Sequence, residues 1–242
     1  MLGALSDPSK MSEALAATGM ELGAVCLVED WTQERETEME RAAADRYIQF
    51  LTHFPGCMFV LCQMPGKDRR SLSERQRNLL DCVNAIALRA AGNGVPCSYH
   101  PNSPEGSIFR TAEDYEILLN GLEPEVIGFA PDVGHIARGG MDPAAILRKY
   151  RERVNHVHFK DINADGQWAR MGRGTIDFPR IVSDLHKSGF GGWVMIEDES
   201  TQAESDPDAS TVENGSYVRD VLAPLCLGCA GTAPTAFQQD GQ

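Results

Sequence analysis

The chain lacks the features of a membrane-bound or nucleic-acid-binding protein. Among its 242 residues, 35 Asp and Glu outnumber 22 Lys and Arg, for a formal net charge of −13. Such an acidic balance repels phosphate backbones and anionic lipid surfaces unless basic residues are strongly segregated, and the sequence contains no basic patch. No apolar run approaches the roughly 20 residues that span a bilayer, and the N-terminus has neither the basic nor the apolar region of a signal peptide. We therefore expect a cytoplasmic protein with neither a nucleic-acid nor a membrane partner.

The cysteine content argues against a fold held together by disulfides. Seven cysteines are an odd number, and several lie in apolar runs such as CMFVLCQ, where a buried thiol packs as a small hydrophobe. With 42% hydrophobic residues, a chain of this length can bury one large core. The sequence therefore predicts a single domain over residues 1–225 and a loose tail over residues 226–242.

Short β-branched runs alternate with longer helical patterns along most of the chain. This alternation predicts repeated βα units and a parallel sheet. The expected strands are residues 22–28, 57–63, 95–100, 126–132, 154–160 and 192–197. The expected helices are residues 8–18, 34–53, 72–92, 111–121, 143–152, 178–188 and 212–224. The stretch that begins at residue 200 is acidic and turn-rich by composition.

Polar side chains that can bind a metal stand at the C-terminal ends of four successive expected strands. They are His100, Asp132 with the nearby His135, His158, and Glu197. In parallel α/β barrels these strand ends form one face, so residues far apart in sequence converge there. Imidazole and carboxylate ligands together suit Mn, Co or Zn better than Ca, which prefers oxygen alone. The sequence therefore predicts a divalent metal site that can polarise a carbonyl for proton transfer.

The stretch VNHVHFKDIN, residues 154–163, carries two histidines with different expected roles. On a strand, His156, His158 and Lys160 share one face, because successive side chains alternate. A histidine at such a position, taken alone, is more often a satisfied core residue than a ligand. Its register with the other strand-end residues nevertheless favours His158 as a ligand.

The motifs HPNSPEGSIF, PDVGHIARGGMDP, HVHFKD, MGRGTIDF and GGWVMIEDES, in this order, resemble a known family. They are similar to the xylose isomerase-like TIM barrels, specifically the sugar phosphate isomerase/epimerase and inosose dehydratase-like group. The resemblance covers about residues 20–200. It implies an α/β fold of the (β/α)8 TIM-barrel type and a metal-dependent activity on a small sugar or polyol.

The resemblance also implies roles for individual residues. The implied metal ligands are Asp132, His158 and Glu197, with His100 as a further candidate. The residues implied to contact the substrate are His135, Lys160, Arg173 and His100. The groups expected to move protons are Glu197, His135 and Lys160. His156 is expected to lie deeper in the barrel, as a packing or supporting residue.

One departure from the family concerns the ligand set. Many members carry a glutamate ligand two residues before a histidine at the end of the fifth barrel strand, and this chain has Ser98 there. Either His100 completes the coordination sphere, or Glu105 reaches in from the loop, or the metal binds weakly. The loss of this carboxylate also argues against the two-glutamate proton transfer of the family's epimerases, and it raises the weight of dehydration.

A second departure concerns the barrel. Only six strands are visible, and the resemblance implies two further β/α units ahead of residues 22–28. A barrel without them exposes two parallel edges and part of its core. We expect a chain that starts late relative to its relatives, by truncation or a misassigned start, or a second copy or partner chain that covers the gap.

These observations predict a divalent-metal-dependent isomerase or epimerase that transfers a proton next to the carbonyl of a small sugar, keto-sugar or cyclitol. One alternative is a dehydratase or lyase that acts on a keto-sugar or inosose. A zinc endonuclease for apurinic DNA would share the fold, but the acidic charge disfavours it. A catalytically impaired remnant or an accessory subunit is the alternative from a different class.

Overall fold

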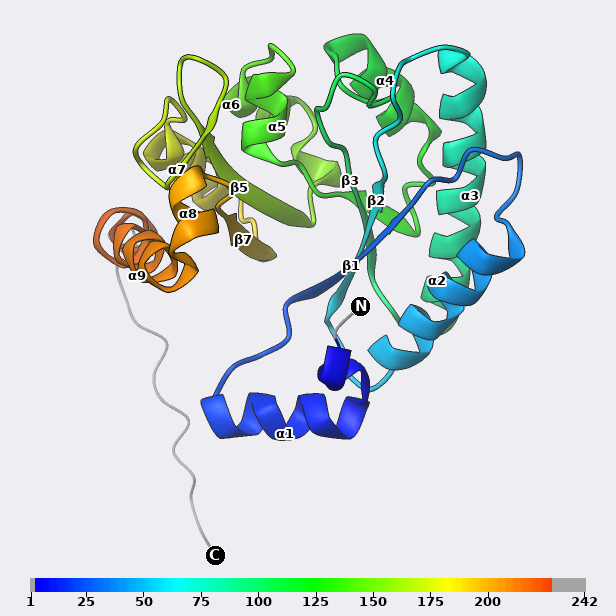
Figure 1. Ribbon diagram of the computed structural model, residues 1–242, viewed down its shortest axis with the longest axis horizontal. Helices are drawn as coiled ribbons and strands as arrows, with labels where there is room; N and C mark the ends of the chain where they lie inside the picture. The colour runs from blue at the N-terminus through cyan, green and yellow to red at the C-terminus, as the bar shows by residue number, and fades with distance from the viewer. Residues whose placement is uncertain (1–2, 228–242) are drawn as a thin grey trace, which may run out of the picture.

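The computed structural model describes residues 3–227 (Figure 1). Its strands are β1 (Ala24–Glu29), β2 (Met58–Gln63), β3 (Cys97–His100), β4 (Ile127–Phe129), β5 (His156–Ile162), β6 (Trp168–Ala169) and β7 (Trp193–Glu197). Its α-helices are α1 (Pro8–Thr18), α2 (Glu38–Leu51), α3 (Leu72–Gly92), α4 (Ala112–Gly121), α5 (Val133–Arg138), α6 (Pro143–Lys149), α7 (Phe178–Lys187), α8 (Thr201–Ser205), α9 (Pro207–Tyr217) and α10 (Ala223–Leu227). Short 3₁₀ turns cover Gly3–Ser6 and Arg151–Arg153, and a π-helical turn covers Val218–Leu222.

The parallel strands follow one another around the sheet in chain order. β1, β2, β3 and β4 are hydrogen-bonded as neighbours, and β5 pairs in parallel with β7. Two isolated parallel bridges, Phe129 to Val154 and Asp132 to His158, connect β4 with β5. The helices lie on the outside of this curved wall, with α2 to α4 beside the first strands and α5 to α7 beside β5 (Figure 1). The six predicted parallel strands and their order are confirmed.

The inward and outward faces of β5 follow from strand alternation. All seven of its residues are buried, as expected for a parallel strand covered on both faces. Phe159 packs on Phe178 of α7 on the helix side, with ring centroids 5.1 Å apart. His156 and His158 belong to the opposite face, where their rings lie 5.0 Å apart. The barrel interior therefore receives His156, His158 and Lys160, whereas Asp161 shares the face of Phe159.

Local capping signals decide where several helices begin. Thr37 forms a capping box with Glu40, so α2 begins at Glu38 rather than at the predicted residue 34. Thr111 forms a second capping box with Asp114 at the start of α4, as its sequence indicates. At α6, Asp142 caps the helix and Pro143 fills its first turn.

Several elements differ from the sequence-based expectation. The six-residue helix α5 was not predicted, because it is short, contains Gly134 and ends at Gly139, so it shows no clear helical period. The strand β6 is two residues long and exists only through its pairing with β5. The stretch expected to be turn-rich contains α8 and α9, which begin at the caps Ser200 and Asp206. Of the predicted tail, the first two residues end α10, and residues 228–242 lie outside the described part of the chain.

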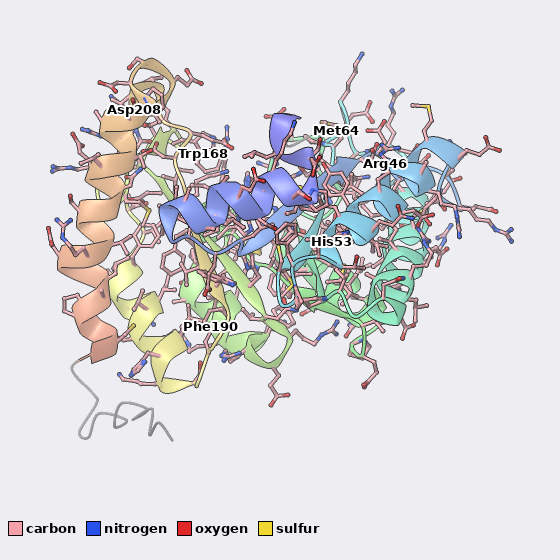
Figure 2. The ribbon with its side chains drawn as sticks, turned by 90° about the horizontal axis from the view of Figure 1, so that it is seen from below. Arg46, His53, Met64, Trp168, Phe190 and Asp208 are labelled. Atoms are coloured by element: carbon pink, nitrogen blue, oxygen red, sulfur yellow. The ribbon has the colours of Figure 1, made fainter. Side chains whose placement is uncertain are left out.

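The curved wall is open between β1 and β7. Within residues 3–227, neither strand has a second strand neighbour on this side. Val28 and Trp193 are 41% and 46% exposed there, which agrees with the expected exposure of two edges. At the N-terminal end of these strands the Trp193 ring lies against Gly23, where an added Cβ would meet it at 3.0 Å. Seen from below, α1 crosses between α9 on one side and α2 on the other (Figure 2).

Among the helices between residues 3 and 227, none combines the length and hydrophobicity that a bilayer-spanning segment needs.

Candidate metal centre

Four predicted side chains meet at the C-terminal ends of the strands. His100 ends β3, Asp132 follows β4, His158 lies on β5, and Glu197 ends β7. One potential ligand atom from each residue lies within 4.8 Å of all the others. The parallel sheet causes this convergence, because it brings four strand ends that are distant in sequence to the same edge. Two imidazoles and two carboxylates could hold a divalent ion here.

Several polar atoms of this cluster have no hydrogen-bond partner although they are buried. Among the described residues, they include both ring nitrogens of His100, Oδ2 of Asp132 and Nε2 of His158. Buried polar groups are normally paired, because an unpaired one loses its hydration without compensation. His100 Nε2 lies 3.7 Å from Asp132 Oδ2, too far for a hydrogen bond. The donor set therefore fits a bound cation that would satisfy these atoms.

Asp132 is held in place by the helix that follows it. Its Oδ1 accepts a hydrogen bond from the backbone N–H of His135 at 2.8 Å, which caps α5 and leaves Oδ2 free. Gly134 allows α5 to approach β5 closely, since an added Cβ would lie 2.5 Å from the backbone oxygen of Lys160. The short helix thus fixes the carboxylate against the strand that carries His158.

Lys160 and Glu197 form the charged edge of the cluster. The Lys160 ammonium lies 2.7 Å from Glu197 Oε2, 2.9 Å from Glu199 Oε1 and 3.8 Å from Asp132 Oδ2. Burial opposes the charged form of Lys160, but the charges of Asp132 and Glu197 outweigh it and raise its pKa. Lys160 therefore stays protonated at the site, although its side chain is only 2% exposed.

Both carboxylates of the cluster are ionised. Burial disfavours the charged form of Glu197, but the His158 hydrogen bond and the Lys160 charge hold its pKa well below its usual range. His158 Nδ1 lies 2.5 Å from Glu197 Oε1. Burial likewise opposes ionisation of Asp132, and the neighbouring His100, His135 and Lys160 lower its pKa. The site therefore contains two negatively charged carboxylates, Asp132 and Glu197, which can bind a cation.

The other two histidines of this region are neutral. Burial lowers the pKa of His135 to about 3, and its Nδ1 lies 2.7 Å from the Ser103 hydroxyl. His156 is fully buried, burial lowers its pKa to about 4, and neither ring nitrogen has a partner among the described residues. Its ring lies next to that of His158, which is the deeper position expected from the strand pattern.

Asp161 organises the loop beside the site rather than the site itself. Its carboxylate accepts backbone N–H bonds from Ile162, Gly174 and Ile176. The loop comes so close that an added Cβ on Gly174 would lie 2.2 Å from Asp161 Oδ1. The loop that contains the MGRGT motif, residues 171–175, therefore folds around the buried carboxylate of Asp161.

Glu105, Ser98 and Arg173 are not among the four candidate ligands. Glu105 is exposed on the loop after β3 and is not part of the four-ligand group. Ser98 is fully buried two residues before His100, and its hydroxyl has no partner among the described residues. Arg173 is exposed and lines a surface hollow together with residues of α9. Within the described part of the chain, it makes no hydrogen bond or ion pair with the four residues of the cluster. Its role at the substrate stays a prediction.

Three residues at the site were not identified from the sequence. Ser103 lies in the loop after β3 and pairs with His135, and Glu199 reaches back to Lys160 from beyond β7. Trp168 lies on β6, with its ring centroid 5.2 Å from that of His135 and 5.0 Å from Lys160 Nζ. None of them belongs to a repeating pattern, so no sequence signal could have identified them.

The sequence of this chain matches known proteins over most of its length. The sequence pattern of the family described as xylose isomerase-like TIM barrel matches residues 4–220. The inosose dehydratase of Geobacillus kaustophilus is 26% identical over 233 residues, with 83% of this chain and 75% of that protein covered. The inosose dehydratase of Clostridium beijerinckii is 27% identical over 165 residues, and the match covers 61% of this chain. The chain spans about half the length of this relative, 55% of it.

Solved structures share the fold at lower identity. The 3-keto-D-glucoside 4-epimerase YcjR from E. coli superposes with a TM-score of 0.71 at 18% identity, covering 88% of this chain and 84% of that one. The IolI protein with a bound zinc atom superposes with a TM-score of 0.73 at 14% identity, covering 93% and 84%. The chain belongs to the xylose isomerase-like TIM barrel family, and its fold is the predicted TIM-barrel type.

Proposed function

We propose that this protein is a divalent-metal-dependent enzyme that removes a proton next to the carbonyl of a keto-sugar or cyclitol and expels water from it. The observation that carries the proposal is the cluster of His100, Asp132, His158 and Glu197, with ligand atoms within 4.8 Å and several of them unpaired. The related inosose dehydratases support the substrate class and the loss of water.

The metal would be held by these four side chains. When bound, a divalent ion polarises a carbonyl and the neighbouring hydroxyl, which lowers the barrier to removing the proton between them. Two imidazoles and two carboxylates favour Zn²⁺ or Co²⁺, and then Mn²⁺, over Ca²⁺ and Mg²⁺, which prefer oxygen ligands.

The remaining groups would bind and position the substrate. Lys160, a buried ammonium beside Glu197, offers a positive charge to an oxygen that becomes negative during proton removal. His135 is oriented by Ser103 and by its place at the start of α5, so that its free ring nitrogen can contact a substrate hydroxyl. These two groups and Glu197 are the candidates for holding or moving protons.

Dehydration is favoured over epimerisation because the second glutamate that the family resemblance implies is missing. An epimerase needs one group to remove the proton and another on the opposite side of the carbon to return it. By the resemblance to the family, the second glutamate is expected at position 98, where this chain has Ser98, and a serine hydroxyl is a poor base. Elimination instead needs one base and one donor for the departing hydroxyl, and the cluster carries both kinds of group.

The test combines metal analysis with product analysis. The purified protein is stripped of metal, reloaded with Zn²⁺, Co²⁺ or Mn²⁺, and incubated with inososes and keto-sugars. We expect about one divalent ion per chain and a product that has lost one water by mass spectrometry. A product with the same mass as the substrate would mean that the reaction is an isomerisation or epimerisation rather than a dehydration. A folded protein that binds none of these metals would refute the proposal.

A further inference from the structure

The hairpin formed by β5 and β6 carries an aromatic residue over the site. β5 continues past its partners, and its last residue, Ile162, pairs antiparallel with Trp168 of β6. The Asn163 side chain closes the turn by accepting N–H bonds from Asp165 and Gln167. The chain therefore folds back above the strand end and brings Trp168 beside the cluster. Figure 2 labels this tryptophan.

The Trp168 indole contacts two residues of the site, Lys160 and His135, and one exposed arginine, Arg138. The Lys160 ammonium lies 5.0 Å from the ring centroid and the Arg138 guanidinium 4.7 Å from it. The His135 ring meets it edge-on at 5.2 Å, with an interplanar angle of 89°. Trp168 is half-buried and is not part of the hydrophobic core cluster. Burial in the core therefore does not explain its position.

We propose that Trp168 is a positioning residue, which holds the Lys160 ammonium and the His135 ring in the orientation that the substrate requires. A cation over an indole face is attracted by the negative charge of the ring face, and this attraction is stronger where water is excluded. Among the described residues, the other charged groups beside the Lys160 ammonium are the carboxylates of Asp132, Glu197 and Glu199, so the indole adds an uncharged face that limits the movement of the ammonium. This inference rests on the proposed function for its effect on turnover, but the contact itself does not.

The experiment compares Trp168→Leu and Trp168→Phe with the unchanged protein. Reductive methylation of lysines, followed by peptide mass spectrometry, reports how accessible Lys160 is, and the exposed Lys187 serves as the internal control. We expect methylation of Lys160 to become about tenfold faster in the leucine variant, with the Lys187 rate unchanged. The phenylalanine variant keeps an aromatic face and should stay close to the unchanged protein.

Kinetics and metal binding complete the test. We expect Trp168→Leu to lower kcat/KM about tenfold and Trp168→Phe to restore most of it, while the affinity for Zn²⁺ stays unchanged in both, because Trp168 supplies no ligand atom. A Lys160 methylation rate that does not change in Trp168→Leu would overturn the inference, as would unchanged kcat/KM with faster methylation. If the unchanged protein turns over no keto-sugar, the proposed function fails, and the methylation rates still decide whether the indole shields Lys160.

Discussion

Replacement of His100 by alanine tests whether this residue stands in for the glutamate that Ser98 replaces. His100 supplies one of the four ligand atoms of the cluster and makes no hydrogen bond through either ring nitrogen among the described residues. Zinc sites with four protein ligands bind with roughly 10–16 kcal/mol in peptides. The loss of one ligand in four removes about a quarter of this, or ~3 kcal/mol, which is about a 100-fold higher Kd.

The assay is titration calorimetry of the metal-free protein with Zn²⁺, at a fixed pH with a competing chelator. His186→Ala, on the exposed face of α7, is the matched control and should bind with unchanged affinity. Thermal unfolding of the metal-free proteins shows whether His100→Ala is still folded. We expect a similar midpoint for the variant and the unchanged protein, because the His100 side chain makes no hydrogen bond among the described residues. If His100→Ala binds zinc as tightly as the unchanged protein, His100 is not a ligand. A loss of zinc affinity in Glu105→Gln would then identify Glu105, on the loop after β3, as the fourth ligand.

Other predictions concern the stability and reactivity of the fold. Asp114→Ala should lower the free energy of unfolding by about 3 kcal/mol in urea titrations, because Asp114 is buried and pairs with Arg69 at 2.5 Å. Phe159→Ala should cost about 3–5 kcal/mol in the same assay, since this ring is fully buried against α7. Burial raises the pKa of Cys57 to about 12, so this thiol stays protonated at pH 8, whereas Cys226 is exposed. Iodoacetamide at pH 8 should therefore modify Cys226 and leave Cys57 unmodified until the protein unfolds.

Each of these has a control within the chain. Val194→Ala on β7 removes an exposed apolar side chain and should cost less than about 1 kcal/mol, in contrast to Phe159→Ala. Asp68→Ala removes an exposed carboxylate that pairs with Arg70, and it should leave stability nearly unchanged. Equal losses in the buried and exposed variants, or rapid labelling of Cys57 in the folded protein, would contradict the burial described above.

The metal-site hypothesis could be formed from the sequence because parallel strands obey a simple rule. His100, Asp132 and Glu197 end an expected strand and His158 lies two residues before the end of another, and all these strands end at the same edge of the sheet. The rule does not extend to residues on irregular segments. Ser103, Trp168 and Glu199 reach the site through loops and a short hairpin, whose paths depend on turn geometry and contacts far along the chain.

The basic segment PGKDRR, residues 65–70, is a case in which the sequence alone does not decide the role of the charges. Lys67, Arg69 and Arg70 follow an expected strand end, and the sequence favours a solvated loop there over an anion site. In the structure Arg69 is paired with Asp114 and Arg70 with Asp68, so two of the three charges are already matched by carboxylates. A sequence cannot distinguish these cases, because the carboxylate that matches Arg69 is 45 residues away.

The βα alternation, the six parallel strands and the strand ends that carry the polar residues could all be predicted from the sequence. Periodicity and capping residues are local properties, so they can be recognised without a partner segment. The structure was needed to show that His100 joins Asp132, His158 and Glu197 within 4.8 Å, that Glu105 stays outside this group, and that Trp168 lies against Lys160. These relations depend on strand register and on the path of loops, which pair residues across long stretches of chain.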